Sequence, residues 1–174
     1  MGYVHDTHMS QFIPPTAMMG VTGTFTQAAG AVAGTIALHR AAAASTGVVT
    51  IPIMLPSNSA VDVAGLPFKG GKLNSIEIDY ELLLAAATSV TAALNKVKRG
   101  ADTAVAVVSS VTITQDLAAA AGAETENQHK MIVTVTTPTY IENDEYYLLT
   151  LTLVCGGTVT VDILAAVANW TFRA

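Results

Sequence analysis

The segment Met131–Leu164, with the sequence MIVTVTTPTYIENDEYYLLTLTLVCGGTVTVDIL, decides the fold of this chain. Within it, residues 131–137, 146–155 and 158–164 alternate apolar side chains with threonine or other polar side chains. This period of two is typical of antiparallel strands that bury one face. The segment therefore predicts three strands of a β-sandwich core, whose inward side chains are Met131, Val133, Val135, Tyr147, Leu149, Leu151, Leu153, Cys155, Val159, Val161 and Ile163.

Two turn signals separate these strands. Pro138 and the sequence Glu-Asn-Asp-Glu at 142–145 interrupt the chain after the first run. Gly156-Gly157 directly follows the second run, and glycine reaches the positive φ values that a two-residue hairpin turn requires. We therefore expect residues 146–155 and 158–164 to form a hairpin.

Strand patterns also cover residues 34–40, 48–55, 72–84, 89–98, 104–114 and 167–172. Pro52 lacks a backbone N–H, which limits its strand to an edge or a bulge. After residue 40 we favour an Ala-rich connection, with a helix over Ala41–Ala44 as the alternative. Residues 89–98 and 104–114 predict a hairpin, and 116–128 a loop with room for one helical turn. The inward side chains of these strands are expected to be Val49, Ile51, Ile53, Leu55, Ile76, Ile78, Tyr80, Leu82, Val105, Val107, Val111, Ile113, Ala168, Trp170 and Phe172.

About eight or nine strands at regular spacing predict an all-β fold of two antiparallel sheets, a β-sandwich of the jelly-roll type. We divide the chain into an extended N-terminal arm, residues 1–23, and a β-sandwich domain, residues 24–174. The arm lacks periodicity and contains Pro14-Pro15. We therefore expect the arm to become ordered when it binds something, such as a neighbouring subunit.

The composition favours a protein that assembles with copies of itself. Hydrophobic residues make up 51% of the 174 positions, and charged residues only 12%. So little charge is a poor surface for a soluble monomer, and an assembly buries part of that surface. The net charge of −5 argues against a nucleic-acid partner. No stretch suits a transmembrane helix or a signal peptide, so we expect no membrane partner and a cytosol-like place of assembly.

Residues 72–84 carry three carboxylates, Glu77, Asp79 and Glu81, on the face opposite their apolar side chains. Glycosidase catalysis and calcium binding are two functional interpretations. However, a catalytic pair of carboxylates usually comes from two different elements. The solvated face of an amphipathic strand is the simpler explanation.

Other polar groups also have simple explanations. His5, Asp6 and His8 have metal-like spacing, but they lie in the arm without a further ligand. Turn propensity explains Asn143-Asp144-Glu145 as well as calcium binding does. Cys155 is expected to be a buried thiol.

His39 and His129 are isolated histidines. Lys96, Lys98 and Arg99 are expected to lie along a solvated sheet edge. Gly70-Gly71-Lys72 lacks the rest of a phosphate-binding loop. The common motifs of hydrolases, zinc proteases and redox proteins are absent from the sequence. We therefore predict no catalytic, cofactor-binding or metal site, no cofactor and no enzymatic activity.

The order of several segments resembles a group of small β-sandwich proteins encoded in tailed bacteriophages and phage-derived environmental sequence. The resemblance spans residues 33–172 and implies a non-catalytic structural protein of the virion. It further implies a capsid decoration (cement) protein, a homotrimer that contacts the major capsid protein or other virion proteins. The segments that carry the resemblance are Ala33–Ala43, Val49–Ile53, Lys72–Tyr80, His129–Met131, Thr136–Pro138, Tyr146–Leu149 and Ala166–Trp170.

Two alternative functions stay open. A head or tail fibre module that binds a host receptor or glycan needs an exposed aromatic and polar cluster at one end of the sandwich. Tyr140, Tyr146 and Trp170 are the aromatic candidates, although we expect Trp170 in the core. A carbohydrate-active enzyme instead needs two acids from separate strands that face one cleft.

Overall fold

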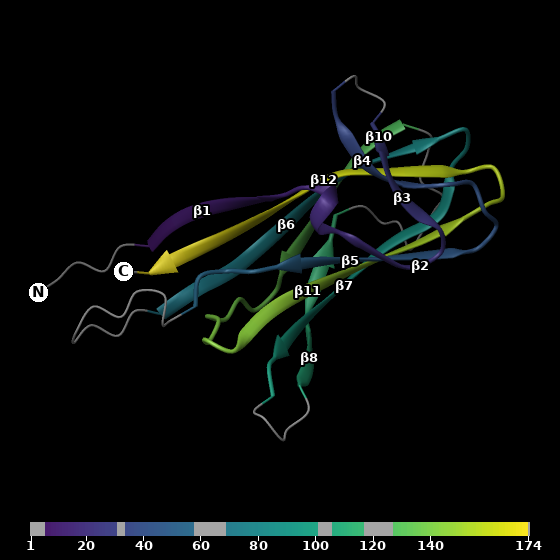
Figure 1. Cartoon of the computed structure of the whole chain (residues 1–174). Helices are drawn as coiled ribbons and strands as arrows, with labels where there is room; N and C mark the ends of the chain where they lie inside the picture. Colours follow the sequence, from purple (N-terminus) through teal and green to yellow (C-terminus); the bar gives the residue numbers. More distant parts are fainter. Residues whose placement is uncertain (1–5, 31–33, 58–68, 101–105, 117–126, 174) are drawn as a thin grey trace, which may run out of the picture.

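The computed structural model describes residues 6–30, 34–57, 69–100, 106–116 and 127–173. These residues form strands and one short 3-10 helix, in the order β1 (Asp6–Ile13), η1 (Pro15–Ala17), β2 (Met19–Thr22), β3 (Phe25–Ala29), β4 (Ile36–Arg40), β5 (Thr46–Ile53), β6 (Lys69–Leu83), β7 (Ala87–Lys98), β8 (Val107–Val111), β9 (Ile113–Gln115), β10 (Asn127–Val135), β11 (Glu145–Cys155) and β12 (Thr160–Arg173). The predicted all-β class is confirmed (Figure 1).

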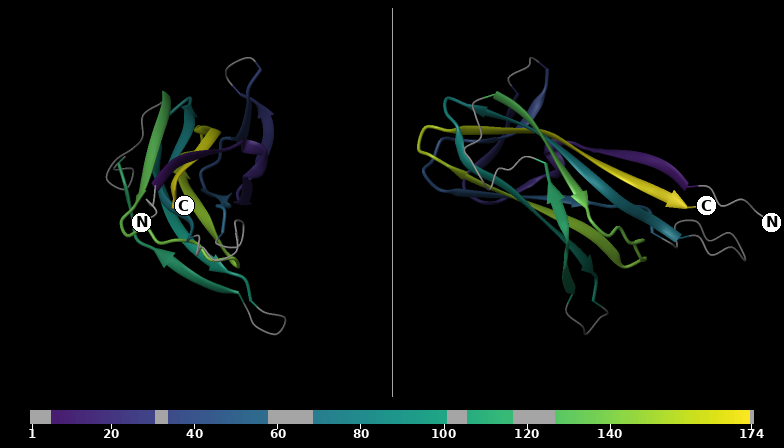
Figure 2. Two further views of the ribbon diagram at one scale, coloured as in Figure 1. Left: turned by 90° about the vertical axis from the view of Figure 1, so that its left-hand side faces the viewer. Right: turned by 180° about the vertical axis from the view of Figure 1, so that it is seen from behind.

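The strands form two antiparallel sheets that pack face to face (Figure 2). The seven-stranded sheet has the order β3-β4-β12-β6-β10-β9, and β1 also pairs with β12. The five-stranded sheet has the order β2-β5-β11-β7-β8. From β4 to β7, and again from β10 to β12, each successive strand lies in the other sheet. This alternation between two sheets is the jelly-roll arrangement that the sequence predicts.

The core lies between the sheets and consists of the side chains that the alternation predicts to face inward. Every inward residue predicted for Met131–Leu164 is buried. The same holds for the two other strongest patterns, 48–55 and 72–84. Trp170 is 6% exposed and packs edge-on against Phe172, so it belongs to the core as expected.

The predicted hairpin at Gly156-Gly157 is wrong. β11 lies in the five-stranded sheet and β12 in the seven-stranded sheet, so the turn carries the chain across the core. The turn closes with a bond of 3.3 Å from the Val159 backbone N–H to the Gly156 carbonyl. Neither glycine has a positive φ. Val159 is already buried at the end of the turn, which draws the chain inward instead of back along β11.

Residues 6–22 are not a separate arm, which corrects the expectation for residues 1–23. β1 pairs with β12 from Asp6 opposite Arg173 to Ile13 opposite Ala166, and β2 pairs with β5. The first five residues lie outside the described part. Most side chains of β1 are exposed. The strand is therefore held mainly by backbone hydrogen bonds and leaves no hydrophobic period in the sequence.

Several strands differ in detail from the sequence-based expectation. β3 was not expected, and Val107 points to solvent because β8 is the terminal strand of its sheet. Pro52 lies beyond the part of β5 that β2 covers, so β5 is an edge there as expected. The connection after Arg40 is not a helix. Val105 and the possible helical turn within 117–126 lie outside the described residues.

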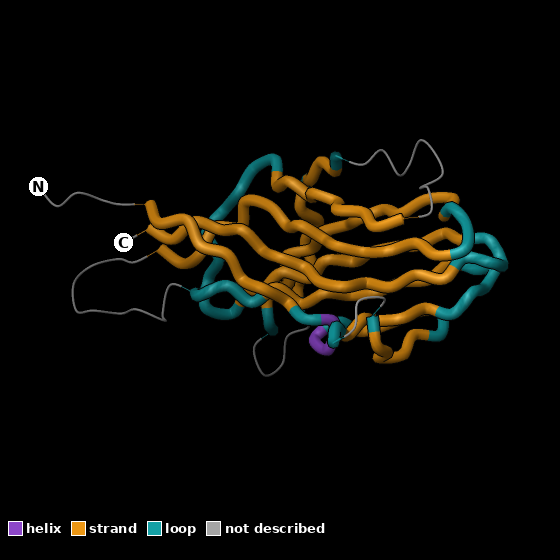
Figure 3. The backbone as a smooth tube through the Cα atoms, turned by 90° about the horizontal axis from the view of Figure 1, so that it is seen from above, coloured by secondary structure: helices purple, strands orange, loops and turns teal. Residues whose placement is uncertain are grey.

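Figure 3 shows that the long strands run along one axis and that β1 and β12 reach the same end of the molecule. β5 and β11 bring further turns toward this end. The end of β7 lies beside the turn before β11, where the Arg99 backbone N–H donates to the Asp144 carbonyl at 2.7 Å. This shared end of the sandwich, called the turn pole below, comprises residues 54–57, 99 and 136–146.

Candidate functional site

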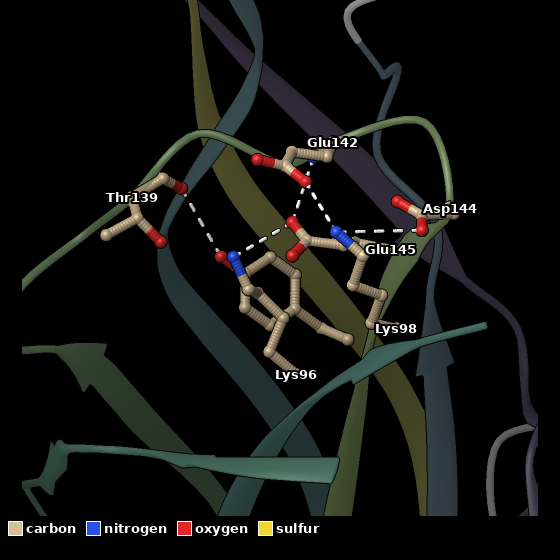
Figure 4. Close-up of polar contacts among 7 residues, drawn as sticks. Lys96, Lys98, Thr139, Glu142, Asp144 and Glu145 are labelled. Carbon is tan, nitrogen blue, oxygen red and sulfur yellow. Dashed lines mark hydrogen bonds and ion pairs between the residues drawn. The ribbon is translucent and has the colours of Figure 1, made fainter. Parts of the chain in front are cut away.

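A cluster of charges stabilises the turn that leads into β11. Lys96 and Lys98 extend from the end of β7, a strand inside the sheet between β11 and β8. Lys96 Nζ lies 2.9 Å from Glu145 Oε2, and Lys98 Nζ lies 2.8 Å from Glu142 Oε2 (Figure 4). Lys98 Nζ also lies 3.7 Å from Asp144 Oδ2. The lysines therefore neutralise an acidic turn, and the prediction that they line a sheet edge is wrong.

Further bonds fix the same turn. The Glu142 backbone N–H donates to Glu145 Oε2 at 2.9 Å, and the Tyr147 hydroxyl donates to the Thr139 carbonyl at 3.3 Å (Figure 4). Burial raises the pKa of Tyr147. The hydrogen bond to Glu142 and the neighbouring carboxylates raise the pKa of Lys98. Side chains of β7 and β11 thus hold the turn in place.

A pocket of about 460 Å³ opens beside this turn. It is lined by Met54, Leu55, Ser57, Arg99, Asn143, Glu145 and Tyr146. The side chain of Glu145 is 8% exposed, and its charge is balanced by Lys96. Arg99 Nη2 makes one long bond, 3.5 Å to the Asn143 carbonyl. The pocket therefore combines an aromatic side chain, aliphatic surface, polar groups and one guanidinium.

A network of polar side chains extends across the outer face of the seven-stranded sheet. Lys130 Nζ lies 2.9 Å from Glu77 Oε2, and Asn169 Nδ2 donates to Glu77 Oε1 at 2.9 Å. The Ser10 hydroxyl donates to Asn169 Oδ1 at 2.7 Å. The hydrogen bond from Lys130 is the main cause that lowers the pKa of Glu77. This chain of bonds joins β10, β6, β12 and β1, so its evident role is to tie strands together.

The three carboxylates of β6 face outward as predicted, but each is partly buried. A hollow of about 370 Å³ on this face contains one described carboxylate, Asp79, next to Lys130. The pocket at the turn pole likewise contains one, Glu145. Neither hollow brings together two described acids from separate strands.

The histidines have structural partners. His39 Nδ1 lies 2.6 Å from Asp162 Oδ1, and Asp162 is buried. His129 stacks on Tyr80 with ring centroids 5.3 Å apart. His8 lies 3.4 Å from the Thr171 hydroxyl, whereas His5 is outside the described residues. Within the described part of the chain, no group of three His, Cys, Asp or Glu side chains is arranged to hold a metal ion.

A third hollow, of about 280 Å³, is mainly apolar and also has Gln11 in its lining. It lies where the chain passes from β1 through η1, and its lining includes Phe12, Ile13, Ala17, Pro52 and Met54. Phe12 and Met54 are 62% and 67% exposed. No helix among the described residues is long and apolar enough to span a membrane.

The sequence identified one aromatic residue of the pocket, Tyr146. The other candidates lie elsewhere, because Trp170 is in the core and Tyr140 lies under Lys72, whose Nζ is 5.5 Å from the ring centroid. Sequence reasoning did not identify Arg99 and Met54 as pocket residues. They follow the ends of β7 and β5, and only the three-dimensional order of the strands brings these ends together.

No family model and no curated protein sequence matches this chain. Two solved structures are similar over most of their length. One is described as the conserved carbohydrate esterase vb_24B_21 from the Shiga toxin-encoding bacteriophage phi24B, with 16% identity, a TM-score of 0.37, and coverage of 88% of this chain and 89% of that one. The other is described by the words "CBM4 structure and function", with 12% identity, a TM-score of 0.32, and coverage of 89% and 91%. At these values neither assigns an activity or a ligand to this chain.

Proposed function

We propose that this chain is a non-catalytic structural protein of a tailed-phage particle, namely a capsid decoration protein that forms a homotrimer and binds the major capsid protein. The resemblance of residues 33–172 to phage β-sandwich proteins supplies the phage context. One structural observation carries the assembly role. Four large exposed apolar side chains come from β1, β2 and the residue that follows β5, and we call them the apolar strip: Phe12, Met19, Val21 and Met54.

The apolar strip is more than scattered surface residues. Phe12 and Met54 line the same apolar hollow, although they come from β1 and the end of β5. Met19 and Val21 follow on β2, directly after η1. Exposed apolar side chains of this kind are typical of protein–protein contacts, because a partner that covers them removes them from water.

The position of β2, the strand that carries Met19 and Val21, strengthens the proposal. β2 is the terminal strand of the five-stranded sheet among the described residues, and all of its side chains are exposed. A terminal strand offers unpaired backbone groups to a second chain. The apolar strip and this edge together form a surface on which another subunit would pair and pack.

Localisation on the phage particle tests the proposed role. Antibodies raised against the purified protein should label the head shell of particles whose genome encodes this chain, as seen by immunogold electron microscopy. Label confined to fibres or the tail would contradict decoration and favour the receptor-binding alternative. Absence of the protein from purified particles would contradict a structural role altogether.

Sedimentation of the purified protein tests the surface. The wild type should sediment as a trimer, and Phe12→Ser with Met54→Ser should shift it to the monomer because the apolar strip is then polar. The matched control is Val107→Ser with Val108→Ser, which removes two equally exposed apolar side chains from the opposite terminal strand, β8. A monomeric wild type, or equal effects of both double variants, would overturn the assignment of the surface.

A further inference from the structure

We infer that the pocket at the turn pole binds a saccharide that carries a carboxylate group. This goes beyond the structural role proposed above, which needs no small-molecule site. The pocket volume of about 460 Å³ lies in the range of about 300–1,000 Å³ that is usual for small-molecule sites. Its lining residues come from the ends of β5, β7 and β11, three strands of one sheet.

Arg99 supplies the charge for the carboxylate. Its backbone N–H donates to the Asp144 carbonyl at 2.7 Å, so the start of the side chain is fixed at the turn. The guanidinium has one bond of 3.5 Å, to the Asn143 carbonyl, and no carboxylate partner among the described residues. An arginine without such a partner matches the planar, bidentate geometry of a ligand carboxylate.

Glu145 does not cancel this charge. Lys96 already neutralises it at 2.9 Å, and the Glu142 backbone N–H also donates to it. Among the described lining residues, Arg99 is therefore the charge that no opposite charge balances. The whole chain carries a net charge of −5, so general attraction of anions to the protein surface does not compete with this site as an explanation.

The other lining groups suit a sugar ring rather than a simple acid. Tyr146 and Met54 supply an aromatic ring and a flexible aliphatic chain to the lining, and these are groups against which the C–H face of a pyranose packs. Ser57 and Asn143 place a hydroxyl and an amide in the same lining, where sugar hydroxyls bind. An inorganic anion would use Arg99 but gain nothing from Tyr146.

The pocket is also pre-organised. Lys96 and Lys98 hold the turn between Glu142 and Glu145 from the neighbouring strand. A ligand therefore finds Asn143 and Tyr146 already in position, and little entropy is lost when it binds.

Calorimetric titration of the full-length protein with trigalacturonic acid and with its methyl ester tests the inference. The two probes share their sugar rings, and only the acid carries charge. We expect the acid to bind about tenfold or more tightly than the ester, because the ester forms no charge-assisted bond with Arg99. Equal binding of the two probes, or no binding of the acid, would overturn the inference.

Variants separate the charge from the ring. Arg99→Gln should weaken binding of the acid about tenfold and leave the ester unchanged. Tyr146→Ala should weaken both probes, while Tyr146→Phe should restore the ring contact and bind nearly as the wild type. The control Lys130→Gln removes an equal charge from the outer face of the other sheet and should change neither.

Two outcomes of the same series would contradict the saccharide site. One is that Lys130→Gln weakens the acid as much as Arg99→Gln does. The other is that poly-aspartate displaces trigalacturonic acid, binds as tightly as it does, and depends on Arg99 to the same extent. The pocket would then recognise carboxylates without the sugar. Labelling of the head shell does not depend on Arg99, so either proposal can fail while the other stands.

Discussion

Replacing Gly47 by alanine should destabilise the protein through close contacts with Arg40 and Phe25. Gly47 lies near the start of β5, and a Cβ atom there would be 2.6 Å from Arg40 Nε, 2.8 Å from Arg40 Cδ and 3.1 Å from Phe25 Cζ. Arg40 is 1% exposed, and its Nη2 donates to the Ser45 carbonyl at 2.7 Å. The added methyl group therefore has to displace a buried, hydrogen-bonded guanidinium.

The magnitude follows from these contacts. Overfilling a packed interior costs about 1–3 kcal/mol, while the stiffer unfolded chain of an alanine variant returns about 0.4–1 kcal/mol. If the bond to Ser45 also lengthens, the loss lies toward the upper end of that range. The upper half of that cost, less the return, is a net loss of about 1–2.6 kcal/mol. For a chain of this length each kcal/mol lowers Tm by about 2–4 °C, so Gly47→Ala should lower Tm by about 2–10 °C.

Urea unfolding followed by circular dichroism measures the effect. Gly156→Ala is the matched control, because a Cβ at Gly156 meets nothing within 4 Å, and it should stay within about 0.5 kcal/mol of the wild type. In the background of Arg40→Ala the cost of Gly47→Ala should largely disappear, since the contact is gone. Equal stability of Gly47→Ala and Gly156→Ala would refute the reasoning.

Three further predictions concern titratable groups. Because the bond to Lys130 lowers the pKa of Glu77, this carboxylate stabilises the fold above the ordinary carboxyl range and loses that effect as pH falls through its lowered pKa. Urea midpoints of Glu77→Gln should therefore decline less steeply with acid than those of the wild type, and an identical decline would contradict the role of the pair. Burial raises the pKa of Tyr147, so its stabilising effect is present below the ordinary tyrosine pKa and is lost as pH rises above it. Because Tyr147→Phe removes the hydrogen bond to Thr139, it should lower the free energy of unfolding by about 0.5–1.5 kcal/mol at neutral pH. The same variant should unfold at a higher pH than the wild type when alkaline unfolding is followed by circular dichroism. Burial also raises the pKa of the Cys155 thiol, so Ellman's reagent should react with it far more slowly in the native protein than in urea, and equal rates would contradict its burial.

The strands of the core could be predicted because burial of one face imprints a period of two. Leu149, Leu151 and Leu153 illustrate this, since each is fully buried and each is separated from the next by a half-exposed residue. β1 could not be predicted, because it does not bury one face in this way. Its exposed side chains carry no such period, and its pairing depends on a partner at the far end of the chain.

The turn at Gly156-Gly157 shows a different limit of local reasoning. Two glycines after a strand indicate a change of direction, but they do not specify whether the next strand pairs or crosses to the other sheet. Likewise, alternating lysines at Lys96 and Lys98 suit a sheet edge, whereas the structure places them on an inner strand opposite an acidic turn. Both distinctions depend on which strands become neighbours, and this is decided by contacts distant in sequence.

Only one residue of the candidate pocket, Tyr146, could be predicted from the sequence. Tyr146 stands on the outward side of a clear alternation, so the sequence offered it as an accessible aromatic residue. Arg99 and Met54 lie in turns without any period, and nothing local connects them. The jelly-roll order brings them to the same pocket.

The pairing of β1 with β12 has a consequence for biosynthesis. The strand partners Asp6 and Arg173 stand at opposite extremes of the described chain, so a ribosome releases β1 long before its partner exists. Until β12 has been synthesised, β1 has no strand to pair with, and the edge of β6 that later pairs with β12 is exposed. Contacts of such high sequence separation form slowly and leave backbone groups open to wrong pairing. Translation products that stop short of Thr160 should therefore aggregate, and a chaperone or rapid capture by sister chains would protect the maturing protein.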